Sequence, residues 1–484
     1  MTVKSFTQLV LIGLFCIPVT MKAQTTGGGV EYKPFHIEEV VQLNDTLNAA
    51  AIRKGRTQLG VALINNKKEI VFDTLFREAV IGMAKFGNGD ELIIFYTDDL
   101  YKKVDAIYAA VINLKTLKIE RDKAIYTLAG EKKAWVSSTV LKDNNGYFKY
   151  LLMRIKDGYS DKEAREVNLL SIPASSLDPL SHDIKGAAIG SKYVASGAGS
   201  NGDWFITSIT GTSLVTELYD NTCKLKNKLQ TTINIREKSG TEAATSWNDD
   251  ATRINMNIRY TNDEKDASMC VYGFDFASKK VFTASPIVLD KAYRKQISEG
   301  QEDLKTSTLK EMEYLTPVKV FNVNNKVVVV NEIEYEFTYS SANGGSTRTR
   351  YYNQAAIINI YDAALKQSST IILDKDLEAF LPWCRRPGFS LQGSKLFMFG
   401  AQLSGIGSFG EYVYIIDLEK GTKVKKDLSP ILKYGDIMNA EASMQFKDSY
   451  VLVAESSVWL SFKLRSFLYN VYFKEVLNAP DSKR

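Results

Sequence analysis

Short apolar runs rich in Val, Ile, Tyr and Phe recur along the chain, separated by Asn, Asp, Gly and Lys about every six to twelve residues. Runs of this length and composition are typical of β-strands. Helical periodicity is confined to residues 290–312, where charged residues surround widely spaced apolar ones. The pattern therefore predicts an all-β protein with one helical insertion.

One unit recurs: an apolar strand that ends in Asn or Asp, a few polar residues, and a strand that turns back. An Asx side chain suits the turn because it can accept a hydrogen bond from the backbone two residues on. Pro173 occupies this position in one copy. The turn positions are Asn65, Asn113, Pro173, Asp220, Asp275, Asp362, Asp417 and Asn470.

The turn positions lie 48, 60, 47, 55, 87, 55 and 53 residues apart. A unit of about 50 residues with four strands is the size of one β-propeller blade, and a closed ring leaves few sheet edges exposed. We predict a propeller of eight blades, each of four antiparallel strands, in residues 24–484. Seven blades are the alternative if the N-terminal strands complete the last sheet. Insertions near 286–316 and 334–354, which we expect to lie outside the regular sheets, explain the long interval.

Within each blade, two inner strands should precede the recurrent hairpin, which should form the outer pair. Trp135, Trp247 and Trp383 fall near the expected starts of innermost strands. This placement favours packing between blades over a platform for a ligand. In the first insertion, Ile297, Leu304, Leu309 and Met312 are expected to place an apolar helix face on the rim.

This strand order resembles β-propellers in general, and more closely the uncharacterised secreted propeller-like proteins of Gram-negative bacteria. The resemblance covers residues 30–476 and lies in spacing, not in a diagnostic motif. The chain lacks a repeated Trp-Asp ending, Kelch double glycines and the Tyr-Trp-Thr-Asp tetrad.

Residues 1–23 have the features of a secretory signal peptide: Lys4, an apolar run over residues 9–19 and a short polar end. We expect cleavage between Ala23 and Gln24, and a periplasmic or secreted protein. Phe15 precedes Cys16 where a lipoprotein signal requires a small residue, which argues against a lipid anchor. The apolar run is too short to span a bilayer, and no later run is longer, so no transmembrane segment is expected.

Composition excludes several functions. The formal charge is +5, and removing Lys4 and Lys22 leaves 59 basic against 56 acidic residues, too small an excess to indicate nucleic-acid binding. The two histidines, His36 and His182, argue against histidine-rich metal sites and serine triads. We expect no metal and no cofactor. Cys223, Cys270 and Cys384 allow at most one disulfide, and buried unpaired thiols are the favoured reading.

Two clusters are candidate ligand sites. Trp383, Arg385 and Arg386 join an indole to two guanidinium groups, which can bind a carboxylate or an acidic sugar by paired hydrogen bonds and stacking. The alternative is an arginine pair that satisfies buried carbonyls or neighbouring acids. Trp247, Asp249 and Asp250 form the second cluster.

Paired carboxylates could support glycoside hydrolysis without histidine. Asp249 with Asp250, and Glu299 with Glu302 and Asp303, are candidates for it, although solvated loops are the simpler reading. The segment 347–352 adds a basic and aromatic strand, read as a protruding, solvated hairpin.

No catalytic set emerges from these residues. We therefore favour an exported binding or scaffold module for a protein or glycan partner, with a carbohydrate-active enzyme as the alternative. Binding is expected at the inter-blade loops and the channel mouth, with the two insertions modifying one rim.

Overall fold

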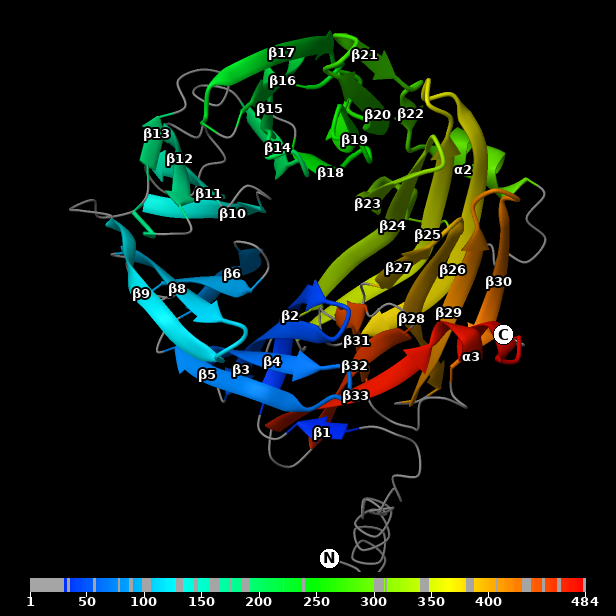
Figure 1. Cartoon of the computed structure of the whole chain (residues 1–484). Coiled ribbons are helices and arrows are strands. Elements are labelled where there is room, and N and C mark those ends of the chain that lie inside the picture. Colours follow the sequence, from blue (N-terminus) through cyan, green and yellow to red (C-terminus); the bar gives the residue numbers. More distant parts are fainter. Residues whose placement is uncertain are drawn as a thin grey trace, which may run out of the picture.

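A computed structural model shows antiparallel sheets arranged around a common centre (Figure 1). The structure describes residues 30–32, 35–54, 58–76, 79–86, 90–97, 106–127, 134–142, 147–156, 166–173, 176–178, 180–183, 192–220, 222–236, 240–299, 309, 311–339, 348–379, 387–405, 408–428, 437–445, 449–458 and 463–481. The expected signal peptide lies outside these residues.

The described residues form eight sheets. The first four contain β2 Phe35–Asn44, β3 Leu47–Lys54, β4 Gln58–Asn65 and β5 Ile70–Phe76; β6 Ala79–Phe86, β7 Glu91–Thr97, β8 Ala106–Asn113 and β9 Lys118–Thr127; β10 Ala134–Lys142, β11 Tyr147–Lys156, β12 Glu166–Pro173 and β13 Leu180–Asp183; and β14 Lys192–Ala198, β15 Trp204–Thr210, β16 Ser213–Tyr219 and β17 Leu225–Thr232.

The next three sheets contain β18 Thr241–Trp247, β19 Arg253–Thr261, β20 Ala267–Asp275, β21 Lys280–Thr283 and the short β22 Ile287–Val288; β23 Leu315–Val323, β24 Lys326–Tyr339, β25 Arg348–Tyr361 and β26 Gln367–Ala379; and β27 Gly388–Gln392, β28 Lys395–Gly405, β29 Ser408–Asp417 and β30 Thr422–Asp427. The last contains β31 Ile437–Gln445, β32 Ser449–Val458, β33 Lys463–Tyr472 and β1 Val30–Tyr32. The helical elements are α2 Lys291–Ser298, η1 Met312–Tyr314 and α3 Phe473–Asn478.

The predicted all-β propeller is confirmed: each sheet runs from an inner strand near the centre of the ring to an outer strand at its circumference (Figure 1). Seven of the eight recurrent units supply the third and fourth strands of a described sheet. The unit at Asn470 does not, because α3 follows β33 directly and β1 pairs with β33 through Val30↔Leu468. The N-terminal strand thus completes the last sheet, and eight sheets are nevertheless present among the described residues.

The Asx side chains hold the turns as expected. Each of six accepts a hydrogen bond from a backbone N–H two or three residues further on, at 2.8 to 3.1 Å. The six are Asn65, Asn113, Asp220, Asp275, Asp362 and Asp417. These bonds satisfy backbone donors that a tight turn cannot pair with its own carbonyls.

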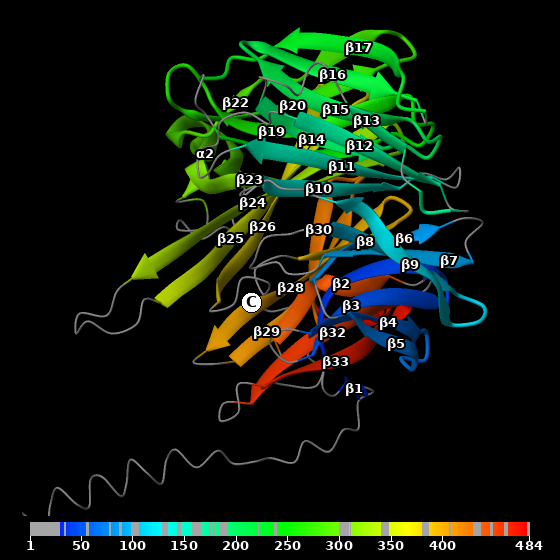
Figure 2. The same cartoon turned by 90° about the vertical axis from the view of Figure 1, so that its left-hand side faces the viewer.

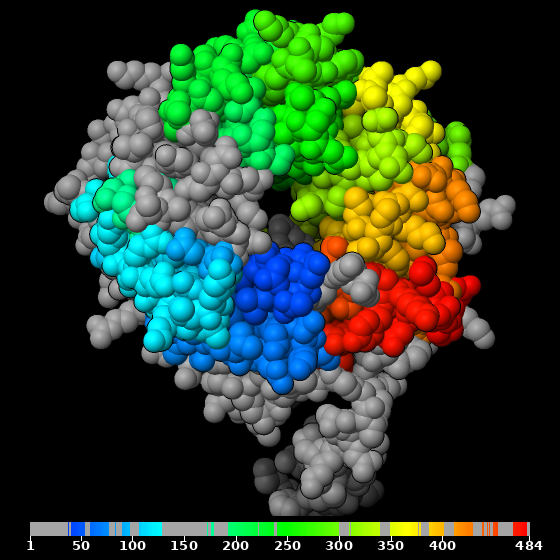
Figure 3. All heavy atoms as spheres, viewed as in Figure 1, coloured from blue at the N-terminus to red at the C-terminus, as the bar shows by residue number. Residues whose placement is uncertain are grey.

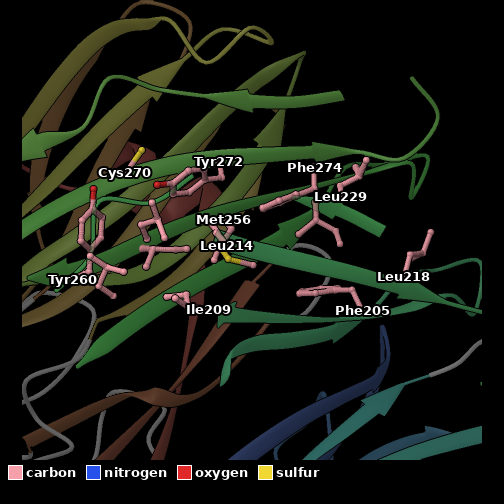
Figure 4. Packing of buried hydrophobic residues seen from close by; sticks show 14 of the residues in the cluster. Phe205, Ile209, Leu214, Leu218, Leu229, Met256, Tyr260, Cys270, Tyr272 and Phe274 are labelled. Carbon is pink, nitrogen blue, oxygen red and sulfur yellow. The ribbon is translucent and has the colours of Figure 1, made fainter. Parts of the chain in front are cut away.

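The hydrophobic core lies between neighbouring blades. One cluster joins Phe205 and Leu214 of the fourth sheet to Met256, Cys270 and Phe274 of the fifth (Figure 4). Cys223 is half-buried, whereas Cys270 is a buried free thiol whose pKa is raised by burial to about 12. Cys270 is thus the buried, unreactive thiol that was expected, whereas Cys384 lies outside the described residues.

The ring has two faces. In each blade, one turn joins the first strand to the second, and in the first seven blades another joins the third to the fourth. These turns lie on one face of the ring, which we call the motif face. The connections from second to third strands, and from one blade to the next, lie on the opposite face, which we call the insertion rim. In the side view, α2 and the projecting ends of β24 and β25 lie together on this rim (Figure 2). The space-filling view shows a hollow at the centre of the ring (Figure 3).

The first insertion forms the predicted helix over a shorter span. Asp290 caps α2 by accepting a hydrogen bond from the backbone N–H of Tyr293 at 2.8 Å. Tyr293 and Ile297 are buried one turn apart and pack with Leu309 and Met312 against the sixth sheet. Leu309 lies in a turn and Met312 begins η1, so these two residues reach the same cluster from outside the helix.

The second insertion differs from expectation. Residues 334–354 were predicted to lie outside the regular sheets, but β24 and β25 keep their pairing from Val327↔Tyr361 to Tyr339↔Arg348. One bulge, at Ile333 and Glu334, interrupts the register. The described part of the insertion, residues 334–339 and 348–354, therefore continues one blade, because backbone pairing between β24 and β25 extends beyond the neighbouring strands.

Candidate binding surface on the insertion rim

The described residues of the two predicted ligand sites, Trp247, Asp249 and Asp250, lie on the motif face. Trp247 ends β18 and packs against Phe205 of the neighbouring blade, with ring centroids 5.7 Å apart, and against Phe276 at 6.4 Å. It therefore packs between blades, as its position in the sequence favoured. Trp383, Arg385 and Arg386 lie outside the described residues.

Asp249 and Asp250 are exposed in the turn between β18 and β19. The Asp250 carboxylate accepts hydrogen bonds from the Thr252 backbone N–H and from its hydroxyl at 2.7 Å. The hydroxyl bond lowers the pKa of Asp250, so this side chain is an ionised turn former.

The described members of the two candidate sets of carboxylates lie on opposite faces of the ring. Glu299 ends α2 on the insertion rim, on the opposite face from Asp249 and Asp250, whereas Glu302 and Asp303 lie outside the described residues. Among the described residues, no group of three or more His, Cys, Asp or Glu side chains is placed to hold a metal ion.

An aromatic cluster lies on the insertion rim instead. Tyr335 of β24 stacks on Tyr352, its partner across the strand pair, with centroids 4.9 Å apart and planes 12° apart. Tyr314 of η1 packs on Tyr335 at 5.3 Å. We call Tyr314, Tyr335 and Tyr352 the tyrosine ladder. It joins the two insertions into one surface.

Exposed groups lie both within the tyrosine ladder and beside it. Tyr314 is 44% exposed, and Phe337, two residues along β24 on the same side of the sheet as Tyr335, is 59% exposed. Arg350 lies opposite Phe337 and forms an ion pair with Glu378 of β26. Gln354 donates a hydrogen bond to the Tyr335 hydroxyl at 2.9 Å. The surface is thus apolar with polar groups at its margin.

The local electrostatics keep Tyr335 neutral. Desolvation is the main cause that raises its pKa, and the nearby acids Glu311 and Glu378 act in the same direction. A tyrosine already has a pKa near 10. The hydroxyl of Tyr335 is therefore a hydrogen-bond donor throughout the physiological range.

A buried ion pair supports the base of the hairpin. The Lys375 ammonium donates to Glu332 Oε1 at 2.7 Å, and Asn353 Nδ2 donates to Glu332 Oε2 at 2.9 Å. Lys375 is 1% and Glu332 0% exposed. These bonds link β24, β25 and β26 where the sheet leaves the ring, so they fix the direction in which the hairpin projects.

Sequence reasoning located this strand but not the surface. Residues 347–352 were noted as basic and aromatic and were read as a solvated hairpin. Tyr314, Tyr335 and Phe337 were not singled out. The signal was present in the alternation Tyr335-Glu336-Phe337-Thr338, which places aromatic rings on one side of a strand and polar groups on the other.

We compared the sequence and the structure with those of known proteins. No protein-family model matches the sequence, and no curated protein matches it significantly. The chain is similar to the WD40 domain of SCAP from fission yeast, with a TM-score of 0.41, 10% identity, and coverage of 92% of this chain and 97% of that one.

It is also similar to the β-propeller domain of the Trilobed protease from Pyrococcus furiosus (TM-score 0.39, 11% identity, 81% and 98% covered). An oligogalacturonate lyase from Vibrio parahaemolyticus gives a TM-score of 0.42 at 9% identity, with 77% and 88% covered. At these values the similarity carries no argument about function. The fold itself rests on the sheet topology.

Proposed function

We propose that the chain is an exported propeller that binds a protein partner through the insertion rim. The observation that carries the proposal is the tyrosine ladder with Phe337 beside it. Tyrosine, phenylalanine and arginine are enriched in the centres of protein interfaces. Large exposed apolar residues that gather at one place on a soluble protein are typical of interaction sites.

A protein partner fits this surface better than a glycan. Sugars stack on the open face of an aromatic ring, whereas Tyr335 is already in contact with two other rings, Tyr314 and Tyr352. The contacts within the ladder therefore leave less open ring face for a sugar. Together with Phe337 and Arg350, these groups match the mixed apolar and polar contacts of a protein interface.

Substitution at the rim tests the proposal. Mature protein carrying both Tyr314→Ser and Phe337→Ser should lose at least tenfold in affinity for the partner, about 1.4 kcal/mol, because two anchors at the centre of the surface are removed. Pull-down from envelope extracts identifies the partner, and titration with the purified partner measures its affinity.

Leu225→Ser provides the matched control, since Leu225 is 48% exposed on β17, away from the insertion rim. Equal binding by the wild type, the control and the rim variant would contradict the proposal. If the protein instead binds a glycan on an array, and the Tyr314 substitution removes that binding, the partner is a sugar and not a protein.

Export is the second part of the proposal. It rests on Lys4, the apolar run 9–19 and the Ala23-Gln24 boundary, and it agrees with the resemblance to secreted propellers of Gram-negative bacteria. No helix within the described residues is long and apolar enough to cross a membrane.

Intact mass of the protein from envelope fractions should match a chain that begins at or near Gln24 and carries no lipid. A mass that retains residues 1–23, or a diacylglyceryl group on Cys16, would contradict the expected processing.

A further inference from the structure

The β24 strand extends past the strand that pairs with its inner edge. Pairing between β23 and β24 ends at Leu315↔Ile333, whereas β24 continues to Tyr339 and stays paired with β25 on its other edge. Among the described residues, no strand pairs with this edge of β24 along residues 335–339, where β23 has already ended. The projecting part is visible in the side view (Figure 2).

Strand edges of this kind are usually protected against pairing by lysine, proline or a covering element. Residues 335–339 contain neither lysine nor proline. The described covering is η1, whose Tyr314 contacts Tyr335 at the base of the projection. The bulge at Ile333 and Glu334 lies before the projection, and pairing with β25 is regular beyond it. Pairing with β25 therefore holds residues 335–339 in the extended conformation that pairing with another strand requires.

The two sides of this strand differ in chemistry. Tyr335 and Phe337 lie on one side, next to Tyr352 and Arg350 of β25. Glu336 and Thr338 are exposed on the other side. A strand added along this edge would place alternate side chains beside the aromatic rings and beside the Glu336 carboxylate.

We propose that the edge of β24 over residues 335–339 receives an extended segment of the partner protein, in which apolar and basic side chains alternate. The inference rests on the proposed function and names the partner's chemistry. Main-chain hydrogen bonds to β24 would supply affinity, and the alternating side chains would supply specificity. Apolar residues would pack beside Phe337, while Lys or Arg would pair with Glu336.

A second copy of this chain fits the edge poorly. Antiparallel pairing of two such edges keeps the equivalent sides together, so Glu336 of each copy would lie on the same side of the shared sheet as its counterpart. Like charges on neighbouring strands destabilise a sheet. The acidic side therefore disfavours self-association and favours a basic partner.

The test uses defined peptides and the mature propeller. The probe is a fluorescent peptide with the sequence Lys-Val-Arg-Val-Lys-Val-Arg-Val, and its counterpart has Glu in place of every basic residue. Two further versions carry N-methyl groups on alternate residues, one set on the odd and one on the even positions. In an added strand, the amides of only one set point toward the edge.

We expect the basic peptide to bind, and one methylated version to lose at least tenfold in affinity while the other keeps it. Glu336→Lys should weaken the basic peptide at least tenfold and reverse the preference toward the acidic one. Glu419→Lys is the matched control, because it makes the same charge change at an exposed turn on the motif face. It should leave both affinities unchanged.

Equal affinities for the two methylated peptides, no binding of the basic peptide, or equal effects of Glu336→Lys and Glu419→Lys would each overturn strand addition. The proposed function, binding of a protein at the insertion rim, is tested by a different result from strand addition. If Tyr314→Ser with Phe337→Ser abolishes partner binding while the peptides do not bind, the rim remains the interface and only strand addition is wrong. If the rim variant also binds its partner normally, both proposals are wrong.

Discussion

Replacing Lys375 with methionine should lower the free energy of unfolding by about 3 to 4 kcal/mol at pH 7. Methionine has nearly the length of lysine, so the packing changes little while the positive charge is lost. Glu332 would then be a buried carboxylate without its cationic partner. Breaking a buried pair on one side destabilises strongly because the remaining charge has no compensation.

Protonation of Glu332 limits how much unfolding free energy the Lys375→Met substitution can remove. Burial is the main cause that raises the pKa of Glu332, and Lys375 is the main cause that opposes it. Without Lys375, Glu332 escapes the penalty by taking up a proton. At pH 7 this costs about 3.7 kcal/mol for a carboxyl with an ordinary pKa of about 4.3, since each pH unit is worth about 1.4 kcal/mol.

The destabilisation should therefore depend on pH. In the variant, the folded state keeps the Glu332 proton to a higher pH than the unfolded state does. Stability is then retained below about pH 4.3 and falls by about 1.4 kcal/mol per unit as the pH rises, until the carboxyl ionises in the folded protein. Urea denaturation of wild type and variant at pH 5, 6 and 7 measures this slope.

Two controls separate the ion pair from general effects. Lys115→Met breaks an equally short ion pair with Asp90, at 2.6 Å, but the two side chains are 72% and 51% exposed. It should change stability by less than about 1 kcal/mol. Adding Glu332→Gln to Lys375→Met removes the buried charge and should recover at least half of the loss. A Lys375→Met effect no larger than that of Lys115→Met would show the pair to be energetically unimportant.

Replacing Gly60 with alanine should lower the free energy of unfolding by about 2 to 3 kcal/mol. Gly60 is in β4, inside its sheet, and pairs with Ile52 on one side and Leu75 on the other. A Cβ at this position would lie 2.1 Å from the Thr74 carbonyl oxygen and 2.9 Å from Leu75 Cδ2. Because the closest atom belongs to the backbone, β5 must shift for the methyl group to fit.

Gly240→Ala is the matched control, since nothing lies within 4 Å of a Cβ there. It should leave stability within about 0.5 kcal/mol or raise it slightly by restricting the unfolded chain. Chemical denaturation of the three proteins measures both effects. If the two alanine variants are equally stable, β5 can move away from position 60 at little cost, and the prediction is wrong.

The sequence pattern predicted the separate elements of the insertion rim but not the contact between them. The sequence predicted two insertions near 286–316 and 334–354, a helix in the first and a basic, aromatic strand in the second. It did not join them, because Tyr314 and Tyr335 meet only after η1 packs beside β24. Tyr293 was likewise missed as an anchor of α2, although it lies four residues before Ile297 and shares its buried face.

Strand positions, hairpin turns and blade spacing were determined by the sequence itself, because alternation and Asx turns depend on residues close together in the chain. Closure of the ring was left open: the sequence allowed the N-terminal strands to complete the last sheet, but only the tertiary structure decided that β1 pairs with β33, almost the whole chain away. The Glu332–Lys375 pair and the tyrosine ladder also required the tertiary structure. Each brings together residues from different elements, and their energies come from burial that exists only after the blades pack.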